Sequence, residues 1–305
     1  MVPARINGKD EKYKGSDYYT MKLLHTSDLH GSQEKYGKLL KFAIKNKVDI
    51  IDLAGDCLPG RDPLIERQGM FCMWLKDWMQ QATDEGIHVV YILGNDDLLV
   101  MDKVLQDYTK LNPMVHWVDN EAVKIGDFIF TGMSCVKDLP YGLKDRARLD
   151  YPSDNPMDIL QPPKAFLTEW ADSGEAKWKE MPIEKWIQYI KLIPTLYDLL
   201  HQLPVIDWEK TVLITHDPPY GIGLDVTNSE EQVGSKAVLD FIELKQPYLT
   251  LHGHIHESPL RTGIWNVMVE DTLCIQVGQP WSYLNAALID LDTRKVEQVK
   301  MQLRR

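Results

Sequence analysis

Histidine, aspartate and asparagine residues recur along this chain in short motifs, each directly after a predicted β-strand. The motifs are Asp28-Leu29-His30, Gly55-Asp56, Gly94-Asn95-Asp96-Asp97, His216-Asp217-Pro218-Pro219 and Gly253-His254-Ile255-His256. Carboxylate oxygen, amide oxygen and imidazole nitrogen are ligand atoms that Mn, Fe, Zn and similar ions accept, and glycine allows a sharp turn at a strand end. The set therefore indicates a site that binds divalent metal ions.

Each motif taken alone has an ordinary structural explanation. A D-x-H or Gly-Asp sequence is usually a solvated loop or a turn, and Asn95 to Asp97 could cap a helix that begins near Leu98. For Asp97, capping and a role in chemistry are equally supported. The ordered recurrence of the motifs favours the metal site, because four of the nine histidines belong to them. Open α/β sheets also place their ligand sites at the carboxyl ends of strands.

The elements that must position these residues follow an α/β pattern, in which short apolar runs alternate with longer helical segments. Strands are predicted at 22–26, 48–53, 88–93, 115–118, 122–125, 128–132, 212–215, 248–251, 265–269, 273–277 and 284–290. Helices are predicted at 34–46, 63–84 and 98–108. Turn signals between 115 and 132 predict antiparallel sheet there. Strand alternation predicts that His254 and His256 face the same side, with His252 on the opposite face in a packing role.

Residues 137–210 differ in composition from the rest of the chain and interrupt the regular succession of predicted strands. They are rich in proline and glycine, contain Trp170, Trp178 and Trp186, and include a predicted helix at 183–200. We predict a single domain over 21–305 with this Trp/Pro-rich insertion. Its tryptophans could line a substrate pocket or a dimer contact, but tryptophans of this kind more often anchor an insertion onto the core. The polar residues 1–20 lack the apolar segment of a signal peptide. We predict that they are a leader, either added to the protein or produced by an alternative start upstream of Met21.

The composition limits the classes of partner and substrate that the protein is expected to bind. With 34 basic and 45 acidic residues among 305, the formal charge of −11 disfavours polymeric nucleic acid and favours a small phosphoester. The widely spaced cysteines indicate neither a zinc knuckle nor a disulfide framework; they are Cys57, Cys72, Cys135 and Cys274. No apolar run approaches the length of a membrane span. These features favour a cytoplasmic protein without a membrane partner and leave the oligomeric state open.

In this order, D-x-H, G-D, G-N-x-D, H-x-P-P and G-H-x-H resemble the motif set of the calcineurin-like metallophosphoesterases. The match spans residues 22 to about 290 without the insertion. Residues 216–221, 233–235 and 253–258 are most similar to the branch of predicted phosphoesterases related to bacterial cyclic-nucleotide phosphodiesterase. The resemblance implies a four-layer α/β/β/α sandwich of two mixed sheets.

The resemblance also implies two divalent metal ions, of which Mn, Fe and Zn are the candidates. The implied ligands are Asp28, His30 and His256 for one ion, Asn95, His216 and His254 for the other, and Asp56 as the bridge. Two ions in such a site share a hydroxide and stabilise both sides of an in-line displacement at phosphorus. The implied activity is hydrolysis of a small phosphoester, and a phosphodiester is favoured over a monoester.

Asp96 departs from the pattern, because many members of the family have a histidine there that is usually assigned to protonating the leaving oxygen or steadying the phosphate. Metal ions nearby lower the pKa of an aspartate and keep it ionised. As the candidate catalytic residue, Asp96 therefore predicts either substrates with good leaving groups or a proton taken from water. Arg61 could reach a phosphate, although a solvated loop arginine is the more common situation.

Two alternatives remain open at this stage. The first is a repair-type nuclease, which the opening sequence from Lys22 to His30 superficially resembles but the acidic charge argues against. The second is a non-catalytic protein-binding scaffold with the same fold. Such scaffolds typically lose ligands, whereas this sequence has all seven.

Overall fold

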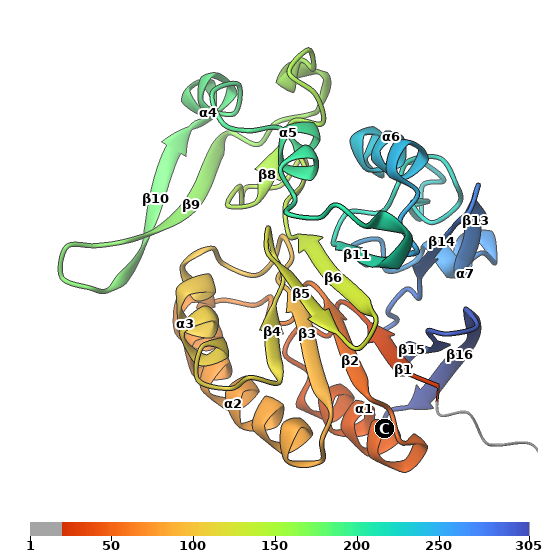
Figure 1. Cartoon of the computed structure of the whole chain (residues 1–305). Coiled ribbons are helices and arrows are strands. Elements are labelled where there is room, and N and C mark those ends of the chain that lie inside the picture. The colour runs from red at the N-terminus through yellow and green to blue at the C-terminus, as the bar shows by residue number, and fades with distance from the viewer. Residues whose placement is uncertain (1–19, 305) are drawn as a thin grey trace, which may run out of the picture.

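Two six-stranded β-sheets packed face to face form the centre of the protein (Figure 1). The computed structural model describes residues 20–304. Helices cover the outer face of each sheet, so the chain has the predicted four-layer α/β/β/α arrangement of two mixed sheets. Apart from Thr20, the predicted leader lies outside the described residues.

The first sheet has the strand order β16-β15-β1-β2-β3-β4, in which β1 to β4 are parallel and β15 and β16 are antiparallel. Its strands are β1 (Lys22–Thr26), β2 (Ile50–Ala54), β3 (His88–Ile92), β4 (Val115–Trp117), β15 (Tyr283–Asp290) and β16 (Lys295–Gln302). Its outer face packs against α1 (Gln33–Asn46), α2 (Leu64–Asp84) and α3 (Val100–Thr109).

The second sheet has the order β13-β14-β12-β11-β6-β5, with a parallel centre and an antiparallel strand at each edge. Its strands are β5 (Ala122–Ile125), β6 (Phe128–Met133), β11 (Thr211–Thr215), β12 (Leu249–His252), β13 (Asn266–Val269) and β14 (Thr272–Gln276). Two helices pack on its outer face, α5 (Leu196–His201) and α6 (Lys236–Lys245). The short α7 (Ser258–Thr262) follows β12.

The space between the sheets is filled by apolar side chains from both. Leu23 and Ile50 of the first sheet belong to the same buried cluster as Ile214 and Leu251 of the second. The central parallel strands are buried on both faces, which explains why their sequences are almost continuously apolar. This core holds the carboxyl ends of β1, β2, β3, β11 and β12 in fixed relative positions.

The region from 115 to 132 is only partly an antiparallel sheet. As predicted, β5 and β6 form a hairpin, but β4 pairs in parallel with β3 in the other sheet. The turn signal at Asp119 and Asn120 marks the crossing from one sheet to the other: the Asn120 amide donates to the carbonyl of Gly132 in β6. The prediction of antiparallel pairing was therefore wrong for β4, because a turn signal does not distinguish a hairpin from a crossing between sheets.

The insertion contains a hairpin that the sequence pattern did not predict, formed by β9 (Lys164–Trp170) and β10 (Ala176–Pro182). Its remaining small elements are β7 (Val136–Lys137), β8 (Ala147–Arg148), η1 (Pro156–Asp158) and η2 (Trp208–Lys210). The predicted helix at 183–200 is two helices, α4 (Ile183–Tyr189) and α5. Pro194 lies between them and cannot donate the backbone hydrogen bond of a continuous helix. Thr195 then caps α5 with a capping box.

The three tryptophans of the insertion have different surroundings. Trp186 is fully buried in a small apolar cluster within the insertion. Trp170 and Trp178 lie on the hairpin with 43% and 40% of their surface exposed. Trp186 therefore packs inside the insertion itself, and the prediction that the tryptophans anchor the insertion onto the core stays a prediction.

Several polar and cysteine side chains have structural roles or surroundings outside the cleft. Ser235 caps α6 by accepting a hydrogen bond from the Val238 amide. His252 is buried and forms hydrogen bonds with Thr215 and Thr250, so it has the predicted packing role. The four cysteines are buried and free. Within residues 20–304, no helix combines the length and hydropathy needed to span a bilayer.

Candidate metal centre

Five strand ends deliver the predicted ligands to one cleft that spans both sheets. The loops after β1, β2 and β3 carry Asp28, Asp56 and Asn95, and those after β11 and β12 carry His216 and His254. The cleft has a volume of about 970 Å³, and five of the seven predicted ligands line it. The strand-end placement predicted from the sequence is therefore the placement observed.

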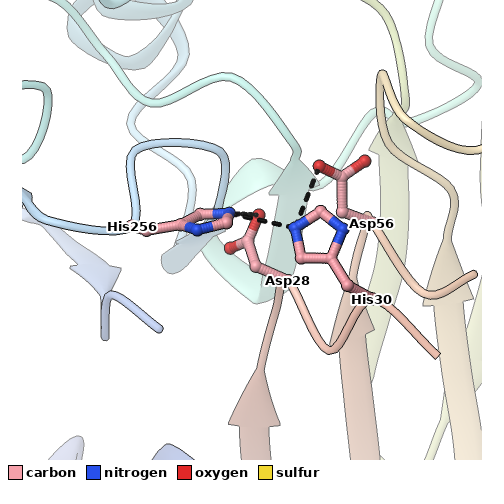
Figure 2. Close-up of side chains that lie close together, drawn as sticks. All are labelled: Asp28, His30, Asp56 and His256. Carbon is pink, nitrogen blue, oxygen red and sulfur yellow. Dashed lines mark hydrogen bonds and ion pairs between the residues drawn. The ribbon is translucent and has the colours of Figure 1, made fainter. Parts of the chain in front are cut away.

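One cluster consists of Asp28, His30, Asp56 and His256, whose side chains point toward one another (Figure 2). Each offers one ligand atom, and these atoms all lie within 4.8 Å of one another. The Nε2 atom of His256 is 3.3 Å from Oδ1 of Asp28 and 3.1 Å from Nε2 of His30. Nε2 of His30 is 3.8 Å from Oδ2 of Asp56.

A second group of side chains surrounds His216. Its Nε2 atom is 3.1 Å from Oδ1 of Asn95 and 3.4 Å from Oδ2 of Asp56. The ring of His254 lies 5.2 Å from the ring of His216, measured between centroids. Because Asp56 is close to both His30 and His216, it lies between the two groups.

The tautomer of His216 is set by the backbone. Its Nδ1 atom is 2.8 Å from the carbonyl oxygen of Ala54, which can only accept a hydrogen bond. Nδ1 therefore carries the proton and donates it, so the lone pair of a neutral imidazole is on Nε2, facing Asn95 and Asp56. Backbone carbonyls commonly orient metal-binding histidines in this way.

The backbone at the site adopts conformations that residues other than glycine rarely take. The φ angles are 56° for Asp28, 45° for His30, 49° for Asp56 and 73° for His254. Each such residue costs about 1–3 kcal/mol, and strain of this kind concentrates at functional sites. The surrounding packing therefore holds four of the seven predicted ligands in place against a local conformational preference.

His254 and His256 reach the cleft for a different reason from the one predicted. Strand β12 ends at His252, so strand alternation does not apply to the residues after Gly253. Instead, the amide of His254 donates to Oδ1 of Asp28 at 3.0 Å, which fixes the turn against the first sheet. The predicted alternation was wrong, although both imidazoles line the cleft.

The glycines of the motifs are required by close approach. A Cβ atom on Gly94 would lie 2.4 Å from Oδ1 of Asp56 and 2.7 Å from Nε2 of His216. On Gly55 it would lie 2.2 Å from Nδ1 of His216. Any side chain at either position would displace the side chains that the cleft brings together.

Asp97 connects two of the ligand loops. It is fully buried and accepts hydrogen bonds from the amides of Cys57 at 2.9 Å, Leu58 at 2.7 Å and Gly94 at 2.9 Å. The N-cap residue of α3 is Leu99, and no side chain caps that helix. Helix capping by Asp97 is therefore ruled out, and its carboxylate instead fixes the loop after Asp56 to the turn before Asn95.

Gln68 is a positioning residue that the sequence analysis missed. This buried side chain on α2 donates to the carbonyls of Pro59 at 3.1 Å and Asp96 at 2.7 Å, and it accepts from the amide of Leu98 at 2.9 Å. It thereby attaches the start of α2 to two loops of the cleft. The available signal was a polar residue within the buried stripe of a predicted helix.

Without metal, the histidines and aspartates of the cleft shift one another's pKa values as paired imidazolium and carboxylate groups. Burial raises the pKa of Asp28, but His256 and His216 outweigh it and hold that pKa well below its usual value. Burial lowers the pKa of His216, but the charges of Asp56 and Asp28 outweigh it and raise that pKa to about 10. Metal ions compete with protons for such ligands.

Asp96 faces the cleft, with 44% of its side chain exposed. Its Oδ2 is 3.7 Å from Nδ1 of His30, its Oδ1 accepts from Nδ2 of Asn95, and its amide donates to Oδ1 of Asp56. The charge of Asp56, followed by burial, raises the pKa of Asp96 to about 7 in the chain without metal. Bound cations would lower it again.

The donor set matches the preference of divalent transition metals for imidazole and carboxylate ligands. Four side chains meet the spacing of a single ion, and Asn95, His216 and His254 adjoin them through the shared Asp56. The residues present therefore fit a site for two ions. Together with the two mixed sheets, this site defines the class of the protein as a metallohydrolase fold.

The particular family follows from comparison with known proteins. The family model described as calcineurin-like phosphoesterase matches residues 21–258, and the chain belongs to this family. No curated protein matches the sequence.

Solved structures share the fold. The protein TT1561 of Thermus thermophilus is 16% identical, with a TM-score of 0.56 over 92% of this chain and 99% of that one. A dimetal phosphatase from Danio rerio is 10% identical, with a TM-score of 0.51 over 93% and 96% of the two chains. At these identities the likeness shows the fold alone.

Proposed function

We propose that the protein is a phosphodiesterase that hydrolyses a small phosphoester with two divalent metal ions. One observation carries the proposal: carboxylate, amide and imidazole side chains from five strand ends converge on one cleft, with Asp56 between two groups of them. The proposed ligands are Asp28, His30 and His256 for one ion, Asn95, His216 and His254 for the other, and Asp56 for both.

Two such ions, when bound, supply Lewis-acid charge at the phosphoryl oxygens and lower the pKa of water towards neutrality. Hydrolysis then forms a bond from the water oxygen to phosphorus as the bond from phosphorus to the leaving oxygen breaks. One water proton ends on the released alcohol and the other is released to solvent.

In this proposal Asp96 interacts with the bound phosphoester but does not donate a proton. It faces the cleft beside His30 and Asn95, and cations at the neighbouring ligands keep its carboxyl ionised. The leaving oxygen therefore takes its proton from water, and substrates with good leaving groups react fastest. The sequence prediction gave these two features as alternatives, and the proposal combines them.

The cleft supports the preference for a diester. A diester carries an organic group on each side of the scissile phosphorus, whereas a monoester carries one. Tyr141 of the insertion and Trp281 both line the cleft, and they are 64% and 74% exposed. Its volume of about 970 Å³ is at the upper end of the range for small-molecule sites.

The test is hydrolysis of bis(p-nitrophenyl) phosphate, p-nitrophenyl phosphate and cyclic nucleotides with Mn, Fe, Zn or Mg. We expect metal-dependent turnover of diesters that is lost in Asp56→Asn and retained in Asp172→Asn, a control on the exposed tip of the β9–β10 hairpin. No turnover of any ester by the metal-loaded chain would overturn the proposal. Degradation of DNA would favour the nuclease, and failure to bind any metal would favour the scaffold.

A further inference from the structure

Two arginines, Arg61 and Arg67, line the metal cleft. Both are exposed, and within residues 20–304 neither guanidinium has an ion pair or hydrogen bond. The chain has 45 acidic and 34 basic residues, so potential partners are plentiful. Two unpaired arginines in one cleft of an acidic protein are therefore available to a ligand.

The arginines lie on the side of the cleft formed by Asp96. A Cβ atom on Gly60 would be 3.3 Å from Oδ2 of Asp96 and 3.5 Å from Nδ1 of His30, so the backbone there borders the metal centre directly. Arg61 is the next residue along this backbone.

Arg67 is held on the same side by its neighbour. It lies at the end of the first turn of α2, where its amide donates to the carbonyl of Pro63. The adjacent Gln68 bonds to the carbonyls of Pro59 and Asp96 and so fixes this turn against the cleft. The two guanidinium groups are thus carried by two segments, 59–61 and the start of α2, that Gln68 joins.

A guanidinium group presents a planar set of donors that matches the oxygens of a phosphate. The scissile phosphate is already accounted for by the metal ligands, so the arginines are additional to the reacting centre. The cleft also has far more volume than a single phosphate occupies.

We propose that Arg61 and Arg67 form an anion subsite that selects phosphoesters carrying a second phosphate group. This inference rests on the proposed function, because it concerns the substrate of that same cleft. It defines the substrate as a small compound with two phosphates, one bound at the metal centre and one on the Asp96 side of the cleft.

The kinetic test uses two substrates with the same reacting ester: thymidine 5′-(p-nitrophenyl phosphate) and its 3′-phosphorylated form. The full-length protein should show kcat/KM about tenfold higher for the doubly phosphorylated substrate, as expected for partly exposed charge-assisted hydrogen bonds. The ratio of the two kcat/KM values should fall close to one in the Arg61→Gln, Arg67→Gln double variant. It should also fall with added salt.

The matched control is Lys41→Gln, Lys45→Gln, which removes the same charge from exposed positions on α1. It should keep the ratio of the unmodified protein. An equal ratio in the control and in the arginine variant would mean that the two arginines have no effect beyond their net charge, and would overturn the inference.

A binding measurement separates this inference from the proposed function. Calorimetry with thymidine 3′,5′-bisphosphate and thymidine 5′-phosphate reports selection without any turnover. Tighter binding of the bisphosphate that disappears in the arginine variant supports the subsite even if no ester is hydrolysed. Equal affinity of the unmodified protein for the two ligands, or a preference that persists in the variant, overturns it.

Discussion

The Asp97→Asn substitution gives the most direct test of how the ligand loops are held together. Both Oδ2 bonds, from Cys57 and Gly94, and the Oδ1 bond, from Leu58, end on a fully buried carboxylate. Asparagine has nearly the same shape but only one accepting oxygen. Its amide nitrogen must therefore face at least one backbone N–H that also donates.

The expected cost follows from the hydrogen bonds that are lost. Burial and the charge of Asp56 raise the pKa of Asp97 to about 7 in the chain without metal, so the value for an ordinary hydrogen bond applies. Such a bond contributes about 0.5–1.5 kcal/mol, and an unsatisfied buried donor costs about 1–3 kcal/mol. Since the remaining oxygen keeps one or two of the three bonds, we expect the free energy of unfolding to fall by about 2–4 kcal/mol. The same change loosens Asp56 relative to Asn95, and we expect metal affinity to fall about 10–100-fold, as for other groups that orient ligands.

Urea unfolding of the metal-free chain and metal titration by calorimetry would measure the two effects separately. The control is Asp172→Asn, an exposed position at the tip of the insertion hairpin, where both quantities should be unchanged. If Asp97→Asn matched this control in stability, the reasoning from the three amide bonds would be refuted.

Three further predictions follow from the geometry. Gly94→Ala should reduce metal affinity more than about tenfold, because its Cβ would lie 2.4 Å from Oδ1 of Asp56. The control is Gly69→Ala, which has open space around it and should leave metal affinity unchanged. Calorimetry would measure both affinities. The pKa of His116 is lowered by burial and by His88 from 6.5 to about 4, so its contribution to stability is present above pH 6.5 and is lost as the pH falls towards 4. Urea unfolding at pH 7.5 and 5 should therefore show a smaller loss of stability in His116→Gln than in the unmodified protein. Removing metal with EDTA should lower Tm and restoring Mn should raise it, because binding at a metal concentration a hundredfold above Kd stabilises the native state by about 2.7 kcal/mol. An unchanged Tm would contradict metal binding to the native state.

The sequence was sufficient to predict which ligand side chains would meet. Parallel strands in one sheet end at one edge, so residues placed after each strand converge whatever the details of the loops. That argument needs only strand positions and residue types. It brings Asp28, Asp56 and Asn95 to one edge of the first sheet, whereas His216 follows β11 of the second sheet and joins them only through the packing of the two sheets.

The sequence could not predict what holds the ligands in place. The bonds of Gln68 and Asp97 join segments far apart in the chain, and local pattern carries no information about such pairs. The left-handed backbone of His254 is stabilised by Asp28, 226 residues away, so its turn could not be predicted from local propensity. In contrast, the break at Pro194 has a local cause, since proline interrupts helices, and the single helix predicted at 183–200 overlooked it.

The division of the ligands between the two sheets has a consequence for the order in which the protein is made. Asp28, His30, Asp56 and Asn95 follow strands of the first sheet, whereas His216, His254 and His256 follow strands of the second. During synthesis, the first half of the site leaves the ribosome well before the second, because the whole insertion lies between Asn95 and His216. The proposed metal centre can therefore be complete only after the second sheet has formed, and an ion held by residues of both sheets would report that the two halves of the chain have met.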